Sequence, residues 1–144
     1  MINLENGELA ISGIVFSPLL HQDELLDKFR ELKLSSSGTC TLKATVEDME
    51  SELYLRFSLS SGLLRTLQIF PRCSVSEEIQ RKWVKYYEAC CDETRKLLGK
   101  LIGETGNQKE AAVFAWGSIG ILSPFDAKNG RNDPPCVCIR YTGE

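Results

Sequence analysis

Apolar and polar residues alternate strictly along two consecutive stretches of the chain, residues 39–46 and 52–59. The alternating apolar positions are Cys40, Leu42, Ala44 and Val46 in the first stretch and Leu53, Leu55, Phe57 and Leu59 in the second. A period of two is that of a strand with one buried face and one face in water. The short connection at residues 60–62 leads into a third apolar stretch, residues 63–70. We therefore expect a three-stranded antiparallel meander, in which the second and third strands form a hairpin.

A period of three to four residues replaces this alternation over residues 75–102. The positions at helical spacing are Ile79, Trp83, Tyr86, Cys90, Thr94, Leu97 and Leu101. Such a stripe is typical of an amphipathic helix that packs on a sheet. Ser74 and Glu77 have the spacing of a capping box, and Gly103 suits a C-terminal cap. The pattern predicts one long helix over residues 75–102.

Two shorter elements are expected before the meander. Residues 9–16 are apolar enough for a strand, and Gly13 within them favours a bulge or a bend. Residues 21–32 carry apolar side chains at helical spacing and acidic residues where a helix begins, so they predict a short helix. His21 stands at its start, where a capping or solvated role is commoner than catalysis.

The C-terminal part is expected to return to strand structure. Residues 111–122 are apolar on both faces, which is typical of a central or covered strand, and residues 136–141 form the last strand. Together these elements predict a single α+β domain over residues 1–144. Its architecture is a mainly antiparallel sheet with two helices, in the order β-α-β-β-β-α-β-β.

Composition and charge narrow the function classes. The chain has 144 residues, of which 42% are hydrophobic and 26% charged, with a formal net charge of −3. This charge disfavours a general nucleic-acid binder, because affinity for phosphates rests on lysine and arginine. No apolar run approaches the length of a membrane span, so no membrane association is expected. The first residues lack the basic and apolar regions of a signal peptide, which favours a cytoplasmic protein.

The cysteines do not have the spacing of a metal site. They are Cys40, Cys73, Cys90, Cys91, Cys136 and Cys138. The chain contains no C-x-x-C pair and only one histidine, so the cysteines are interpreted as small buried thiols. Nucleophile elbows, phosphate-binding loops and dinucleotide fingerprints are also absent from the sequence. The sequence therefore assigns no catalytic residue, no metal and no cofactor, and it favours a protein that is not an enzyme.

One polar segment before the last strand carries the candidate binding residues. Asp126 opens a turn rich in asparagine and glycine, but the calcium-loop pattern fails because a lysine stands at its third position and valine at its twelfth. We expect a long exposed hairpin loop, and rigid scaffolds often present binding residues on such loops. The candidate binding residues are Trp116, Asp126, Lys128, Arg131 and Asp133.

The C-terminal segment also carries a family resemblance. The string "FAWGSIGILSPFDAKNG…VCIRY" resembles the C-terminal end of small bacterial proteins of the polymorphic-toxin immunity type, through Trp116, Gly117, Asp126, Lys128, Gly130 and Tyr141. Proteins of that type are small cytoplasmic α+β domains that inhibit a cognate toxin by occluding it. The resemblance therefore implies a binder without turnover, and it carries over no binding residue.

Three hypotheses about function follow from these observations. The first is a cytoplasmic protein-binding module, of the immunity type that binds and occludes a bacterial toxin. The second is a secretion-type chaperone, usually a homodimer, that holds a protein partner in extended form. The third is an enzyme of a class that the sequence does not identify. The oligomeric state, and whether the partner is bound folded or extended, discriminate between the first two.

Overall fold

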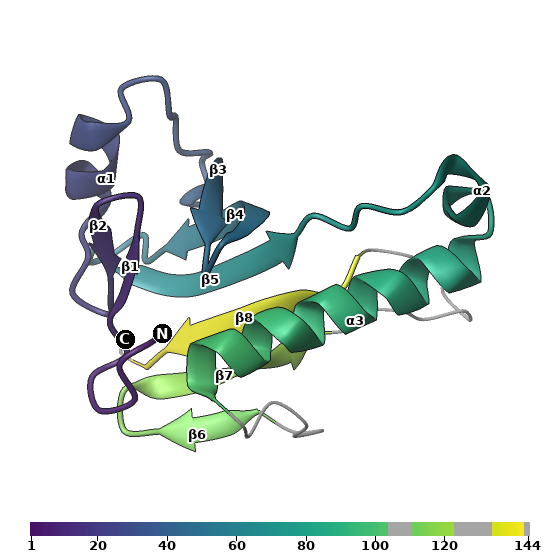
Figure 1. Cartoon of the computed structure of the whole chain (residues 1–144). Coiled ribbons are helices and arrows are strands. Elements are labelled where there is room, and N and C mark those ends of the chain that lie inside the picture. Colours follow the sequence, from purple (N-terminus) through teal and green to yellow (C-terminus); the bar gives the residue numbers. More distant parts are fainter. Residues whose placement is uncertain (104–110, 123–133, 143–144) are drawn as a thin grey trace.

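The computed structural model describes residues 1–103, 111–122 and 134–142 (Figure 1). These residues form eight strands and three helices, so the predicted α+β class is confirmed. In chain order the elements are β1 (Leu9–Ile11), β2 (Ile14–Phe16), α1 (Gln22–Lys28), β3 (Thr39–Val46), β4 (Met49–Phe57), β5 (Leu64–Pro71), α2 (Glu77–Gln80), α3 (Trp83–Ile102), β6 (Ala112–Phe114), β7 (Gly117–Leu122) and β8 (Cys136–Tyr141).

Six of these strands in the described residues form one sheet in the order β3-β4-β5-β8-β7-β6, and every neighbouring pair is antiparallel. The meander predicted from the alternating pattern is confirmed as β3-β4-β5. The last strand, β8, lies between β5 and β7, which brings the C-terminal part of the chain beside the meander. Two neighbouring strands that are far apart in sequence thus meet in the middle of the sheet.

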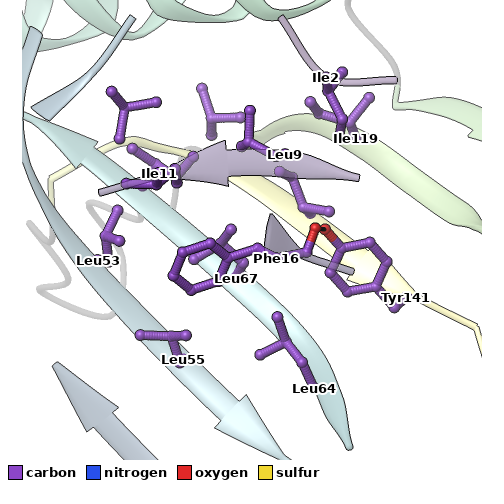
Figure 2. Packing of buried hydrophobic residues seen from close by; sticks show 14 of the residues in the cluster. Ile2, Leu9, Ile11, Phe16, Leu53, Leu55, Leu64, Leu67, Ile119 and Tyr141 are labelled. Atoms are coloured by element: carbon purple, nitrogen blue, oxygen red, sulfur yellow. Dashed lines mark hydrogen bonds between the residues drawn. The ribbon is translucent and has the colours of Figure 1, made fainter. Parts of the chain in front are cut away.

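The core lies on one face of this sheet. Figure 2 shows Leu9, Ile11 and Phe16 of the β1–β2 hairpin packed against buried residues of the sheet, among them Leu53 and Leu67. The C-terminal half of α3 covers β5, β8 and β7 with its own buried leucines. Full burial of each such large side chain contributes about 1.5–3 kcal/mol. The opposite face of the sheet carries the polar positions of the alternating pattern.

The first expected strand, residues 9–16, is instead a hairpin of its own, β1 and β2. Ser12 and Gly13 between the strands both have positive φ angles, 52° and 78°. Two consecutive residues of positive φ are characteristic of the tight turns that match the twist of a hairpin. Gly13 therefore marks a full reversal of the chain, where the sequence indicated a bulge or a bend.

Residues 111–122 also differ from the single strand expected. They form a second hairpin, in which Phe114 of β6 pairs with Gly117 of β7 across a two-residue turn. Gly117 has a φ of 149°, and an added Cβ would overlap the carbonyl oxygen of Arg140. Only glycine fits this close approach, and the apolar pattern of the segment does not reveal the turn.

The long helix expected over residues 75–102 is two helices, α2 and α3. Ser76, and not Ser74, caps α2, by accepting a hydrogen bond from the backbone N–H of Ile79 at 3.4 Å. Lys82, with ψ of 83°, interrupts the helical path before α3 begins. No residue of α2 is buried. Burial of side chains therefore does not favour a single helix that continues through Lys82. Figure 1 shows α2 and the first turns of α3 extending past the ends of the strands.

The short helix α1 begins where the sequence predicts and ends earlier, at Lys28. His21 has the expected capping role: its Nδ1 accepts a hydrogen bond from the backbone N–H of Asp23 at 3.1 Å. Because Nδ1 is the acceptor, the proton of the neutral ring is on the other nitrogen.

Candidate binding cleft

A cleft of about 860 Å³ opens where β4 begins and β5 ends, beside the N-terminal half of α3. Its walls come from three neighbouring strands, from the chain that follows β5, from α3 and from the two prolines before β8. Its lining includes Lys43, Glu50, Glu52, Phe70, Arg72, Cys73, Tyr86 and Cys90. We call this site the arm cleft, because α2 and the exposed half of α3 project beside it.

The charges at the mouth of the arm cleft are balanced. Lys43 stands directly opposite Glu52 in the β3–β4 ladder. Arg72 forms an ion pair with Glu50 at 2.9 Å, and both side chains are more than two-thirds exposed. Ion pairs of this kind contribute little to stability, with a median near 0–1 kcal/mol. These four charged groups therefore remain available to exchange partners with an incoming charged surface.

A group of two thiols and one phenol lies on the α3 side of the cleft. The side chains of Cys73 and Tyr86 both lie close enough to that of Cys90 to interact with it. Burial, and then the contact with Cys90, raise the pKa of the Cys73 thiol to about 11. The interaction with Cys90, followed by burial, also raises the pKa of Tyr86. At neutral pH the Cys73 thiol is protonated, so it is a weak nucleophile.

The apolar part of the cleft consists of aromatic and proline surface. Phe70 and Pro71 come from the end of β5, Tyr86 from α3, and Pro134 and Pro135 from the chain before β8. An apolar floor with a charged rim is the usual anatomy of a protein–protein interface. In the described part of the chain no cluster of three or more histidine, cysteine or acidic side chains has the arrangement of a metal site. The arrangement is thus suited to holding a polypeptide surface by contact.

Trp116 has a structural environment. It is 7% exposed, and its Nε1–H donates a hydrogen bond of 2.9 Å to the carbonyl of Leu4. Its ring stacks on Phe114 with 5.2 Å between centroids and lies where a side chain at Gly7 would stand. The indole therefore anchors the N-terminal segment onto the β6–β7 hairpin, and a binding role for Trp116 stays a prediction.

The other four predicted binding residues, Asp126, Lys128, Arg131 and Asp133, lie outside the described residues.

The sequence did not indicate the arm cleft, although two of its charged side chains stand where the pattern predicts them. Lys43 and Glu52 are on the polar face that alternation predicts, where a solvated role is the ordinary interpretation. Tyr86 belongs to the helical stripe that was expected to pack on the sheet, yet it is 36% exposed. The cleft exists because the end of β5 and the exposed half of α3 meet, and the local pattern contains no signal for that meeting.

Comparisons with protein-family models, curated proteins and solved structures found no match for this chain. Among the described residues, no helix combines the length and the apolar character that a membrane crossing requires.

Proposed function

We propose that this protein is a cytoplasmic binding module that recognises a protein partner through the arm cleft, and that it acts as an immunity-like inhibitor that binds and occludes a bacterial toxin. The observation that carries the proposal is the cleft itself. It combines aromatic and proline side chains with two acidic and two basic side chains. This composition matches a folded protein surface better than a small metabolite, for which enclosed and mainly apolar pockets are typical.

Recognition at such a site depends on charge complementarity and on a few aromatic contacts. Tyr86 and Phe70 supply the large rigid side chains that dominate binding energy in protein interfaces. Lys43, Glu50, Glu52 and Arg72 supply charges of both signs, so the partner must present a complementary pattern and not a uniformly charged surface. An inhibitor of this kind acts by covering its target and needs no reacting group of its own.

A second candidate is a chaperone that holds its partner in extended form, and the edge of the sheet favours it. Within the described residues, β3 has no hydrogen-bonded neighbour on its outer side. Three consecutive residues of that strand, Lys43, Ala44 and Thr45, line the arm cleft. An extended peptide in the cleft would therefore have a free strand edge to pair with.

The first experiment recovers the partner and then tests the cleft with purified components. The tagged protein is isolated from its native host, the protein that co-purifies is identified, and the binary affinity is measured by calorimetry. Glu52→Lys reverses a charge at the rim and leaves the buried residues untouched. Glu31→Lys makes the same charge change at an exposed position outside the cleft and is the matched control.

We expect Glu52→Lys to weaken binding by tenfold or more and Glu31→Lys to leave it unchanged, because a like-charge contact at an interface costs more than about 1.4 kcal/mol. The partner should be toxic when expressed alone and harmless when co-expressed with the wild-type chain. A partner that is bound while unfolded, by a dimer of this protein, would favour the chaperone. Equal affinities for the wild type and Glu52→Lys would contradict a binding role for the arm cleft.

A further inference from the structure

A second cleft, of about 540 Å³, lies at the opposite end of β4, where β4 ends and β5 begins. Three arginines line it, Arg56 from β4, Arg65 from β5 and Arg140 from β8. The rest of its lining combines the hydroxyl-bearing side chains of Ser37, Ser58, Ser60 and Thr66 with the side chains of Phe57, Leu59 and Tyr141. Among the described residues no acidic side chain lines this cleft. We call it the arginine cleft.

The register of the sheet sets two of the arginines on either side of one threonine. Arg56 pairs with Thr66 across β4 and β5, and Thr66 pairs with Arg140 across β5 and β8. Directly paired residues point to the same face, and neighbouring strands are about 4.8 Å apart. The backbones of Arg56 and Arg140 are therefore separated by about 10 Å. Arg56 Nη2 donates to the Thr66 hydroxyl oxygen at 3.5 Å, so this guanidinium lies over the threonine.

An irregularity in the sheet supplies the third arginine. Phe57 pairs with Leu64 and Arg56 pairs with Thr66, so Arg65 is an extra residue without a partner in the β4–β5 ladder. Bulges of this kind redirect a side chain, and they are common beside functional sites. Nη1 of Arg65 donates to the carbonyl oxygen of Thr142 at 3.2 Å, which holds the guanidinium near the end of β8. Nε of Arg65 is buried and has no hydrogen-bond partner among the described residues.

These three guanidinium groups have no counter-charge among the described residues. In the part of the chain that the structure describes, none of them lies within 4.0 Å of a carboxylate, whereas Arg72 and Arg95 each form an ion pair. The formal net charge of the chain is −3, so an excess of basic residues does not explain the cluster. Like charges on adjacent strands repel each other, and an anion bound between them removes this cost.

We propose that the arginine cleft binds a small phosphate compound, either inorganic phosphate or a phosphate monoester, with its phosphoryl group held by the guanidinium groups of Arg56, Arg65 and Arg140. A phosphoryl group offers three oxygen acceptors and up to two negative charges, and the planar guanidinium matches it in two-point contacts. A carboxylate carries only one negative charge, whereas the cleft presents three positive ones. The serine hydroxyls suit the polar remainder of a monoester, and the cleft is large enough for one. This site is separate from the arm cleft and does not rest on the protein-binding function.

The test is a titration of the wild-type protein followed by NMR of backbone amide and arginine Nε–Hε groups at constant ionic strength. The probes are inorganic phosphate, glycerol 3-phosphate, acetate and glycerol. We expect saturable shifts at Arg56, Arg65 and Arg140 with the two phosphates and none with acetate or glycerol. Tighter binding of glycerol 3-phosphate identifies a monoester site, and tighter or equal binding of inorganic phosphate identifies a free-phosphate site.

Two exposed arginines of the cleft can be removed without disturbing the core. Arg56→Met and Arg140→Met should each weaken phosphate binding about tenfold or more, because each removes charge-assisted hydrogen bonds to the anion. Arg30→Met makes the same charge change at an exposed position outside the cleft and should leave the affinity unchanged. Absence of saturable binding, equal weakening by Arg30→Met, or acetate binding as strong as phosphate binding would each overturn the proposal.

Discussion

Tyr141 joins three parts of the fold through one buried hydroxyl. The side chain is 4% exposed and belongs to β8. Its hydroxyl donates to the carbonyl oxygen of Gly7 at 2.9 Å and lies 3.4 Å from the carbonyl oxygen of Phe16. The first carbonyl is in the N-terminal segment and the second ends β2. Replacing Tyr141 with phenylalanine keeps the ring in place and removes only this hydroxyl.

The cost of Tyr141→Phe at neutral pH follows from that geometry. A buried hydrogen bond contributes about 0.5–1.5 kcal/mol net, and a buried acceptor left without a donor costs about 1–3 kcal/mol. The Gly7 carbonyl loses its tyrosine donor in the variant. We therefore expect the free energy of unfolding to fall by about 1–3 kcal/mol.

Because of this hydroxyl, we expect the difference in unfolding free energy between wild type and Tyr141→Phe to change at alkaline pH. Burial raises the pKa of Tyr141 well above its ordinary value. In the unfolded chain this tyrosine ionises near pH 10, while in the folded protein it stays protonated, so its contribution to stability is complete below about pH 10 and falls as the pH rises further. At about pH 11 the unfolded state gains about 1.4 kcal/mol from this ionisation. The variant has no such loss, so its deficit relative to wild type should shrink by about that amount.

The assay is urea denaturation of both proteins, under reducing conditions, at pH values from about 7 to 11. Burial also raises the pKa of Cys40 and, to about 12, that of Cys136. At high pH, ionisation of these thiols in the unfolded state therefore lowers the stability of both proteins equally. Subtracting the two curves isolates Tyr141. Tyr54→Phe, on the opposite face of the sheet, controls for the general effect of removing a tyrosine hydroxyl. Equal stability of wild type and Tyr141→Phe at neutral pH, with parallel curves above pH 10, would refute the reasoning.

Further predictions concern stability and are all measured as urea unfolding free energies. Gly117→Ala should destabilise the protein by about 3 kcal/mol or more, because its φ of 149° is unfavourable for alanine and the new Cβ would overlap the Arg140 carbonyl; a change below 1 kcal/mol would contradict this. Gly99→Ala should stabilise it by about 0.5–1 kcal/mol, since the site is helical and an added Cβ meets nothing within 4 Å. Leu67→Ala should cost about 2–5 kcal/mol, because this side chain is fully buried in the sheet core. His21→Ala should cost about 1 kcal/mol through loss of the α1 cap, and an unchanged stability would argue against that cap.

The sequence alone did not reveal the two clefts, because their residues come together only when the strands of the sheet pair. Arg56 and Lys43 were both expected on the polar face, and they are there. Neither residue by itself indicates a site, since a solvated charge is the common case. Arg56 becomes part of a cluster only because β8 lies beside β5 and brings Arg140 into its row. The segment that the sequence did indicate, around Asp126, lies outside the described residues.

Local pattern determined the elements whose stabilising contacts are close in sequence. The alternation over residues 39–59 and the short connections within it specify the β3-β4-β5 meander, because a register slip would expose its apolar face. The helical period likewise indicates α3: the expected positions Cys90, Thr94, Leu97 and Leu101 are buried, and Leu98 and Ile102 are buried in addition. For these elements burial periodicity and turn chemistry agree, and distant contacts only reinforce them.

Tertiary structure decided what depends on contacts between distant segments. The turn before Gly117 is determined by the approach of that glycine to Arg140 of β8, and the helical path breaks at Lys82, next to a helix α2 in which no residue is buried. The position of β8 between β5 and β7 builds the arginine cleft, and the meeting of β5 with α3 builds the arm cleft. These features follow from the free energy of packing the whole chain, which no local window of residues contains.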